Sequence, residues 1–401
     1  MPQDAVVSTP TVAIVGGGPA GLMLSHLLHR GGIDSVVVER RTRDESETTH
    51  RAGILEADSV RMLVETGVSD RVLREGDEHE GIDLRFGGVS HRIDFGHHIG
   101  ESVWLYPQTD VFIDLADARA RDGGDVRFGA SDVTVHDVDS TSPRVSFTDA
   151  DGTPQELRPT LVVAADGSRS ECRDLVPERL RRTFRREYPF AWFGILCEAP
   201  PSAPELVYTH SERGFALISQ RTPTVQRMYF QCDPGTKADD WSEEQIWDEF
   251  QARVAGEDDF HLHTGPIIDK TVLGFRSFVQ EPMRYGTLLL AGDAAHTVPP
   301  TGAKGLNLAL ADVHTLAALI ESALAADDLD VLDHYTPRAL ERVWRAQNFS
   351  YWMTQMLHHP GNGEGASFDS RRQLGELASV VGTEGGQRYV AECYTGWPLR
   401  K

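Results

Sequence analysis

Cysteine is scarce in this sequence, and its positions form no paired motif. The chain has four cysteines among 401 residues, and they stand far apart without a CxxC pair. This spacing excludes a disulfide scaffold and a zinc site built on thiolates. It is typical of a protein that works in a reducing cytosol.

Long apolar runs and an excess of basic residues are also missing. No run approaches the ~18 apolar residues that a membrane span needs, and the first ten residues, MPQDAVVSTP, do not resemble a signal peptide. With 39 Lys and Arg against 61 Asp and Glu, the net charge is −22. Such a chain repels phosphate backbones and anionic lipid, which excludes nucleic acid and membranes as main partners. We therefore expect a cytoplasmic protein whose local arginine clusters can still bind a small anion.

The residues that are present predict a globular protein with an α/β beginning. The chain is long enough for roughly two to three domains, and it has 40% apolar and 25% charged residues. A short β-rich run at 11–15 is followed by a helical leucine pattern at 22–30 and a second β-rich run at 35–39. This order predicts a right-handed βαβ unit.

The middle of the chain has a different pattern. Four short strand-like runs, at 190–197, 206–209, 214–220 and 226–231, are separated by Pro and Gly turns. Such runs predict an antiparallel sheet, and a helix with a Ser242 cap follows at 241–256.

The last third returns to α/β character. A buried strand is expected at 287–290, a long apolar helix at 306–325 and a last, aromatic helix at 332–358. We find no internal repeat, so the domains are interleaved. We assign an α/β domain to 1–76, 103–180 and 271–340, a β-sheet domain to 77–102 and 181–270, and a helical region to 341–401.

A glycine-rich turn lies between the first strand and the first helix. Gly16, Gly18 and Gly21 form a G-x-G-x-x-G pattern, in which the backbone can approach a pyrophosphate at a helix N-terminus. Glu39 ends the second strand, where a carboxylate accepts hydrogen bonds from ribose hydroxyls. The pattern indicates a dinucleotide site but does not separate FAD from NAD.

Two further aspartates lie just beyond buried strands. Asp166 precedes Gly167, and Asp293 follows Gly292. Each pair offers a close backbone and a carboxylate to a sugar-phosphate hydroxyl, although either alone is also an ordinary turn.

Together, in this order and spacing, the three motifs resemble those of the flavoprotein aromatic hydroxylases, and specifically the 4-hydroxybenzoate 3-monooxygenase family. The likeness spans nearly the whole chain and is sharpest at 299–307, with further matches at 51–56, 79–81, 213–221 and 276–279. It implies a Rossmann-like FAD-binding domain interleaved with an antiparallel-sheet substrate domain, plus C-terminal helices.

The resemblance also implies the chemistry. Such enzymes bind FAD, reduce it with NADH or NADPH, and form with molecular oxygen a flavin C4a-hydroperoxide that hydroxylates a phenol. The type reaction converts 4-hydroxybenzoate into 3,4-dihydroxybenzoate. An electrophilic oxygen needs an electron-rich ring, so the site should promote loss of the phenolic proton.

Individual residues match the functional positions of that family. The planar fork of Arg221 suits a substrate carboxylate, and His79 suits the solvent end of a proton relay because histidine titrates near neutrality. From the residues alone, a surface role for either would be the commoner one. The matching positions are Tyr208, Tyr394, His79 and Pro300 for catalysis; Ser219, Arg221, Tyr229, Trp192 and Thr301 for substrate; and Arg51, Gln108, Asp293, Leu306 and Asn307, beside the glycines and Glu39, for FAD.

The nicotinamide side departs from the family pattern. Arg40, Arg173 and Arg276 keep the basic character expected for NAD(P)H binding, but Thr49 and Glu45 stand where an arginine and an aromatic residue are usual. Coenzyme choice is therefore left open, with NADH expected to work at least as well as NADPH. Lys304 is expected to hold positive potential near the flavin, and the aromatic helix is assigned to packing or to a contact in a homodimer.

Three alternatives compete with this interpretation. The same chemistry could act on a substituted benzoate such as 3-amino-4-hydroxybenzoate, which the pocket residues do not distinguish. A flavin oxidase or dehydrogenase would use oxygen only to reoxidise the flavin. A non-catalytic binding protein on the same fold is the third, because fold does not fix function.

Overall fold

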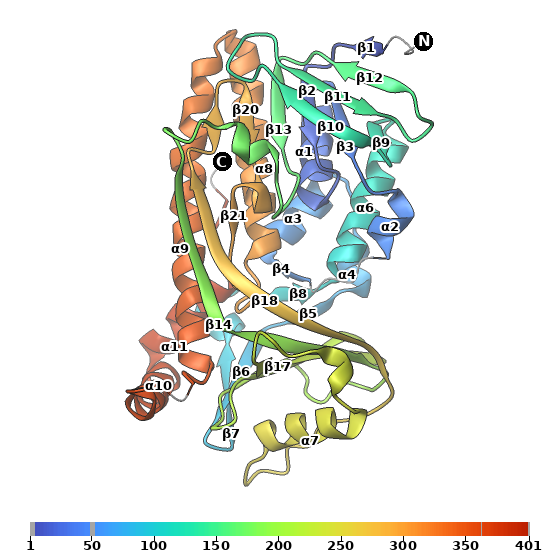
Figure 1. The fold of residues 1–401 in the computed structure, drawn as a ribbon. Coiled ribbons are helices and arrows are strands. Elements are labelled where there is room, and N and C mark those ends of the chain that lie inside the picture. Colours follow the sequence, from blue (N-terminus) through green and yellow to red (C-terminus); the bar gives the residue numbers. More distant parts are fainter. Residues whose placement is uncertain (1–4, 49–52, 362, 400–401) are drawn as a thin grey trace.

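The computed structural model describes residues 5–48, 53–361 and 363–399. Figure 1 shows an α/β part that contains the N-terminal strands and a β-sheet part with α7 (Glu243–Val254) at its outer end, while α9 (Tyr335–Leu357) runs beside both. The chain passes between the two parts several times. The predicted mixed α/β fold with interleaved parts is confirmed.

The α/β part is built on a six-stranded sheet with the order β19-β20-β13-β2-β3-β9. Neighbouring strands are parallel except for β19 and β20. The predicted βαβ unit is present as β2 (Val12–Val15), α1 (Pro19–Arg30) and β3 (Ser35–Glu39). Its strands are runs of buried β-branched residues, as a parallel sheet covered on both faces requires. The other strands are β9 (Asp125–Phe128), β13 (Leu161–Ala164), β19 (Arg284–Tyr285) and β20 (Leu288–Leu290).

Two smaller sheets and several helices surround this core. The four-stranded sheet has the order β1-β12-β11-β10, and the three-stranded sheet has the order β4-β8-β5. Their bounds are β1 Val6–Ser8, β4 Ile54–Glu56, β5 Asp77–His79, β8 Val103–Leu105, β10 Ser131–His136, β11 Arg144–Thr148 and β12 Pro154–Leu157. The helices are α2 Arg43–Glu47, α3 Ala57–Glu65, α4 Arg71–Glu75, α5 Phe95–Ile99, α6 Gln108–Arg121 and α8 Gly305–Ala326, with 3-10 turns η1 Cys172–Leu175, η2 Ala238–Asp240, η3 Gly292–Ala294 and η4 Leu329–His334.

Helix α8 is apolar because it is a core helix. By length and composition it could cross a membrane, with a mean hydropathy of 1.5, which was not predicted from the sequence. However, 56% of its most apolar stretch is buried, and the helix packs against α1 and α9. Its composition is therefore accounted for by packing inside the protein.

The β-sheet part is an eight-stranded sheet with the order β21-β18-β14-β17-β16-β15-β6-β7. The four predicted runs pair antiparallel, as expected, and β15 also pairs with β6 in parallel. Strand β14 is longer than predicted, because it begins at Arg182, inside an arginine-rich run at 179–186. Strand β18 continues through the domain boundary proposed at 270/271. The bounds are β6 Gly81–Phe86, β7 Val89–Asp94, β14 Arg182–Cys197, β15 Leu206–Thr209, β16 Ala216–Thr222, β17 Val225–Cys232, β18 Ile267–Glu281 and β21 His296–Thr297.

The two faces of this sheet bury different clusters. Because side chains alternate along a strand, one face carries Tyr208 and Leu217, and the other carries Val207 and Ile218. The second face is closed by α7, whose Phe250 packs on it; Ser242 forms the predicted cap, reinforced by Gln245. The first face points toward the C-terminal helices, which makes it the side on which a buried site can form.

The C-terminal helices that the resemblance implies are confirmed, although the apolar pattern itself placed none after residue 358. After α9, which was expected to be the last helix, come α10 (Ala366–Val381) and α11 (Glu384–Thr395). Phe349 of α9 is buried, whereas Trp344 is 41% exposed. The predicted packing role of the aromatic helix is therefore present, and α11 brings the end of the chain back to the β-sheet part.

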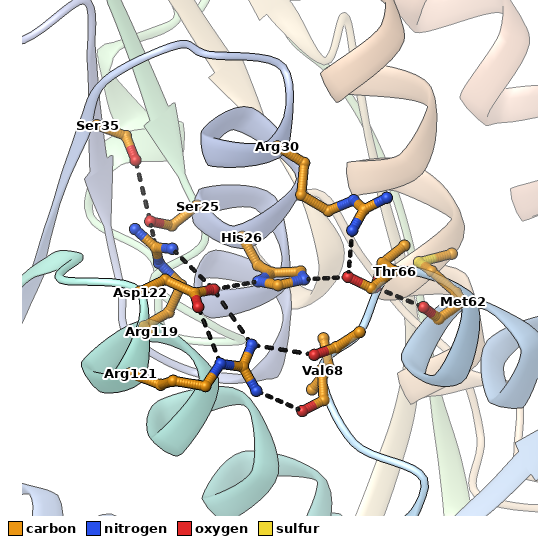
Figure 2. A network of polar contacts seen from close by, with 11 residues as sticks. Ser25, His26, Arg30, Ser35, Met62, Thr66, Val68, Arg119, Arg121 and Asp122 are labelled. Carbon is orange, nitrogen blue, oxygen red and sulfur yellow. Dashed lines mark hydrogen bonds and ion pairs between the residues drawn. The ribbon is translucent and has the colours of Figure 1, made fainter.

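The polar network in Figure 2 connects the C-terminal half of α1 to Thr66 and to the end of α6. His26 Nε2 lies 3.0 Å from the carbonyl oxygen of Thr66, and its Nδ1 lies 3.4 Å from Asp122 at the end of α6. Arg30 donates to the same Thr66 oxygen, and Arg119 donates to Ser25. These contacts fix the direction of α1, whose opposite end faces the glycine-rich turn.

Candidate active site

The glycine-rich turn leaves an open backbone at one glycine and a tight one at the others. A Cβ on Gly16 would collide with Ala165, and one on Gly21 would collide with Gly16 itself, whereas a Cβ on Gly18 meets nothing within 4 Å. Gly16 also has a φ of +109°, which side chains rarely adopt. Gly18 stands at the N-cap of α1, where backbone N–H groups and the helix dipole favour an anion. The turn therefore fits a pyrophosphate.

Glu39 and Asp166 offer carboxylates beside this turn. Glu39 accepts hydrogen bonds from the backbone N–H groups of Gly17 (2.6 Å) and Arg41 (2.9 Å), which fixes its orientation at the end of β3. Asp166 accepts from the backbone of Cys172 through Oδ2, but its Oδ1 is buried without a hydrogen-bond partner. A buried carboxylate oxygen of this kind is costly unless a ligand or water donates to it. Both groups fit a dinucleotide.

Arg173 joins the two aspartate loops that the sequence singled out. Its Nη2 donates to the carbonyl oxygens of Gly167 (3.0 Å) and Asp293 (3.3 Å), and the side chain is buried. Arg276 donates to the Ser168 carbonyl from the same side. Two of the three predicted NAD(P)H residues thus meet at these loops, while Arg40 is exposed after β3.

The Gly292–Asp293 turn is held from below by a buried ion pair. Asp312 of α8 accepts from the Gly292 backbone (2.8 Å) and from His296 Nε2 (2.7 Å). Burial opposes the imidazolium, but the Asp312 carboxylate raises the pKa of His296 above its ordinary value. This contact positions the turn that carries the predicted FAD residue Asp293.

The loop before α8 packs its polar groups against β4. Asn307 donates to the Ile54 carbonyl (2.9 Å) and accepts from the Glu56 backbone (3.0 Å). Lys304, expected to hold positive potential near the flavin, is buried in an ion pair with Glu56 (2.7 Å) and also donates to the Tyr394 carbonyl (2.7 Å). Its charge is therefore paired with a carboxylate, and its contribution to the potential near the flavin stays a prediction.

Tyr208 and Tyr394 form a buried pair. Their hydroxyl oxygens are 2.7 Å apart, although one comes from β15 and the other from α11. Burial raises the pKa of Tyr208 to about 12, opposed by its hydrogen bonds to Tyr394 and the Gly302 backbone. Burial also raises the pKa of Tyr394 well above its ordinary value. Both phenols stay protonated near neutral pH, so one can donate to a substrate oxygen while accepting from the other.

A pair of arginines lies at another point of the same face. Burial lowers the pKa of Arg221, and the like charge of Arg227 lowers it further. Arg227 also has a buried Nη1 without a hydrogen-bond partner. Ser219 donates to the Arg227 carbonyl (2.6 Å), and Tyr229 lies under the Arg227 guanidinium. In the part of the chain that the structure describes, no salt bridge involves either arginine, so the pair suits an incoming carboxylate.

Aromatic side chains close the site near α9. Trp192 stacks on Phe215 at 5.1 Å and donates from Nε1 to His358 Nε2 (2.7 Å). Thr301 is buried and accepts a hydrogen bond from Thr354 of α9 (3.0 Å). Pro300 stands beside Thr301 and is half-buried. Trp192, Pro300 and Thr301, which the resemblance assigned to substrate binding and catalysis, therefore lie around one region between the sheet, the loop before α8 and α9.

His79 is buried rather than solvated. It belongs to β5, and its Nε2 lies 2.8 Å from the Gln220 amide nitrogen and 3.2 Å from Asp77. Gln108 and Leu306 stand at the first turns of α6 and α8, whereas Arg51 and Thr49 lie outside the described residues.

Sequence reasoning missed Arg227, Glu56 and His358. Arg227 precedes Tyr229 by two residues on one strand, so period-two alternation could have placed it on the substrate face. Glu56 and His358 gave no such signal, because their partners lie 248 and 166 residues away.

Known proteins are similar to this chain in sequence. The profile of a protein family described as "FAD binding domain" matches residues 9–350. A p-hydroxybenzoate hydroxylase of Acinetobacter baylyi is 41% identical over 96% of this chain and 95% of its own, and a rifampicin monooxygenase of Streptomyces venezuelae is 26% identical over 95% and 74%.

Solved structures agree on the fold. A p-nitrophenol 4-monooxygenase from Pseudomonas putida DLL-E4 superposes with a TM-score of 0.79 at 18% identity, covering 98% of this chain and 100% of that one. A Diels–Alderase of pyrroindomycin biosynthesis has a TM-score of 0.74 at 23% identity, covering 96% and 80%. Because that neighbour is named for a different reaction, the shared fold alone does not fix the chemistry.

Proposed function

Because the chain belongs to the FAD-binding-domain family of flavin-dependent aromatic monooxygenases, we propose that its substrate is a 4-hydroxybenzoate-type acid, which it hydroxylates beside the phenol. The type reaction is the conversion of 4-hydroxybenzoate into 3,4-dihydroxybenzoate. FAD, NAD(P)H and oxygen are the cofactor and co-substrates of this family. When bound, FAD would supply the redox chemistry: electron transfer from NAD(P)H to oxygen and transfer of one oxygen atom to the aromatic ring.

One observation supports the substrate class above all. The buried tyrosine pair and the two arginines without a salt bridge stand at separate points on the same face of the eight-stranded sheet. Tyr208 lies opposite Leu217, and Ser219 and Arg221 follow along β16. A para-hydroxy acid has a phenol at one end of the ring and a carboxylate at the other, which matches this arrangement.

At the carboxylate end, the chain's own residues would bind and orient the substrate. Arg221 can pair with the carboxylate through two parallel N–H groups, which fixes the ring plane as well as the position. Arg227 supplies a further cation, and Ser219, whose hydroxyl donates to the Arg227 carbonyl, would turn that proton toward the carboxylate when substrate binds. Trp192 and Thr301 exclude water from the ring, so the charge pair forms in a desolvated site.

At the phenol end, the residues would hold and move a proton. Tyr208 would accept the proton of the substrate hydroxyl while it passes its own hydroxyl proton to Tyr394, because each hydroxyl both donates and accepts. The ring becomes more electron-rich as its proton is withdrawn. We propose that His79 carries the proton onward toward solvent.

Residues outside this face support proposals on the reductant and the assembly. Arg173 and Arg276, beside the Asp166 and Asp293 loops, are proposed to contact NAD(P)H, with Arg40 at the edge. A homodimer and a cytoplasmic location remain part of the proposal; the exposed Trp344, packed edge-on against Phe184, offers one surface for the dimer.

The test is a panel of substituted benzoates with purified, FAD-loaded protein. NAD(P)H oxidation and product masses should be followed with 4-hydroxybenzoate, 3-amino-4-hydroxybenzoate, benzoate and phenol. Hydroxylated product is expected from acids that carry a para-hydroxyl, and little from benzoate or phenol. Efficient hydroxylation of phenol would contradict the proposed carboxylate recognition. A strong preference for 3-amino-4-hydroxybenzoate would identify that acid as the substrate instead.

A further inference from the structure

His79 has two polar neighbours that compete for one ring nitrogen. The amide nitrogen of Gln220 lies 2.8 Å from His79 Nε2 and 2.6 Å from Asp77 Oδ2. Asp77 Oδ2 is itself 3.2 Å from His79 Nε2. The Gln220 NH₂ group has two hydrogens, so it can donate one to the imidazole and one to the carboxylate.

Each of these two contacts on Nε2 suits a different neutral tautomer of the imidazole. When Gln220 donates to Nε2, that nitrogen must be bare, so the proton is on Nδ1. His79 Nδ1 is buried and has no hydrogen-bond partner. In the opposite tautomer, Nε2 carries the proton and donates to Asp77, and Nδ1 becomes a buried acceptor.

His79 borders the core that holds the tyrosine pair, and Asp77 borders solvent. His79 pairs in the β-ladder with Val103, which belongs to the same core cluster as Tyr208 and Tyr394. The carbonyl of Glu80, the next residue, accepts from the backbone of Phe95, and Phe95 stacks on Tyr394 at 5.3 Å. On the other side, the side chain of Asp77 is 52% exposed while that of His79 has no exposed surface.

The charged groups that face His79 are both acidic. Asp77 is on its own strand, and Glu205, which is paired with Arg92, approaches from the start of β15. Glu78 is held away by a hydrogen bond from Ser102. Burial lowers the pKa of His79, and the two carboxylates oppose this, so the imidazole is neutral for most of the time at pH 7.

We propose that Asp77 is the proton acceptor that connects His79 to solvent, and that Gln220 is the positioning residue that holds the tautomer left after the proton has gone. In one step, Nδ1 gains a proton from the buried side while Nε2–H passes its proton to Asp77 Oδ2, and the charge of the imidazole does not change. Asp77 then releases the proton to water. The inference rests on the proposed function, since it assumes that a phenolic proton leaves the site.

The experiment measures how fast bound 4-hydroxybenzoate ionises. The FAD-loaded enzyme with bound substrate is jumped from low to high pH, and the phenolate absorbance is followed by stopped flow. Asp77→Asn should slow this step by about tenfold, because a positioned proton acceptor has been removed. The matched control, Glu78→Gln, removes the same charge one residue away without touching His79 and should leave the rate unchanged.

Chemical rescue separates proton transfer from a structural effect. Asp77→Ala should be slowed as Asp77→Asn is, and formate added to the buffer should restore its rate, since a small carboxylate can replace the missing one. Ionisation at the wild-type rate in both variants, or equal slowing in Glu78→Gln, would overturn the inference. If the wild type itself never ionises the bound phenol, the proposed function fails, and this inference with it.

Discussion

The hydroxyl oxygens of Tyr208 and Tyr394 lie 2.7 Å apart, although 186 residues separate them in the chain. The carbonyl of Tyr394 accepts from Lys304, which is paired with Glu56 of β4. The contact between the two hydroxyls therefore joins the β-sheet part to α11, and the bond from Lys304 joins α11 to the loop before α8. This relationship is the basis of the proposed phenol activation.

Replacing Tyr208 by Phe should uncouple the reaction without loss of flavin. The phenolic proton loses its first acceptor, so the ring is less electron-rich, and hydroxylation should slow by about 10²-fold. Most of the NAD(P)H consumed should then yield hydrogen peroxide, which a peroxidase assay measures beside the aromatic product. Tyr188→Phe, another buried tyrosine whose hydroxyl meets Ser277, is the control. Unchanged coupling in Tyr208→Phe would remove that residue from the mechanism.

Gly18→Val should fold but fail to bind FAD. The backbone at Gly18 has a φ of −72°, and its Cβ direction is open, so the side chain costs the fold little. It would, however, occupy the space proposed for the pyrophosphate. Purified variant should be colourless with native circular dichroism, and titration with FAD should show no binding. Gly21→Val, which must collide with Gly16, should instead unfold; a yellow Gly18→Val protein would show that the pyrophosphate lies elsewhere.

Arg221→Lys should weaken the binding of 4-hydroxybenzoate by about 2–4 kcal/mol, the scale for losing part of a desolvated charge pair. The ammonium of lysine cannot form the two parallel hydrogen bonds of the guanidinium. The measurement is substrate affinity from the flavin absorbance change, with Arg185→Lys on the exposed end of β14 as control. Equal affinity of the wild type for phenol and 4-hydroxybenzoate would show that Arg221 does not anchor a carboxylate.

Because of the segment after β3, NADH should work at least as well as NADPH. Arg43 is engaged by Glu47 and Asp117, and Glu45 forms a capping box with Thr42. The carboxylates oppose a 2′-phosphate by about 1 kcal/mol at a protein surface. Glu45→Gln keeps the cap and should raise the NADPH-to-NADH ratio of kcat/KM by about fivefold, the same energy expressed as a rate ratio. A wild-type preference for NADPH of about tenfold or more would show that the arginines of this segment outweigh its carboxylates.

His358 should make the fold sensitive to mild acid. Burial lowers the pKa of His358 to about 3, against an ordinary 6.5. Because the folded state binds the proton less readily than the unfolded state, stability is complete above pH 6.5 and is lost as the pH falls toward 3. Between pH 7 and pH 5 this amounts to about 2 kcal/mol. His358→Gln should therefore show a smaller fall in thermal midpoint over that range; an identical fall would contradict the assignment.

Much of the fold was predictable because its signals are local. The glycine-rich turn from Gly16 to Gly21 and the apolar run that ends at Glu39 predict the βαβ unit. Ser242 predicts the start of α7. C-terminal helices were implied by the resemblance, but the pattern placed no individual helix after residue 358, where Gly375 in α10 and Gly385 and Gly386 in α11 lower the intrinsic helix propensity. These helices pack against α9 and α5.

The site was predictable only where resemblance supplied long-range information. No local pattern could show that Lys304 is neutralised by Glu56, that Trp192 donates to His358, or that His79 is buried. A charged stretch such as 77–80 normally indicates a solvated surface, and only the β5–β8 ladder and Gln220 enclose the imidazole. Burial of polar groups is decided by tertiary contacts, which the sequence does not display.

The most direct test of the account is the ratio of hydroxylated product to NAD(P)H consumed with 4-hydroxybenzoate under ¹⁸O₂. We expect close to one 3,4-dihydroxybenzoate for each NAD(P)H, with one ¹⁸O atom in the new hydroxyl group. NAD(P)H oxidation that yields only hydrogen peroxide across all para-hydroxy acids would contradict it, and would assign the protein to the flavin oxidases.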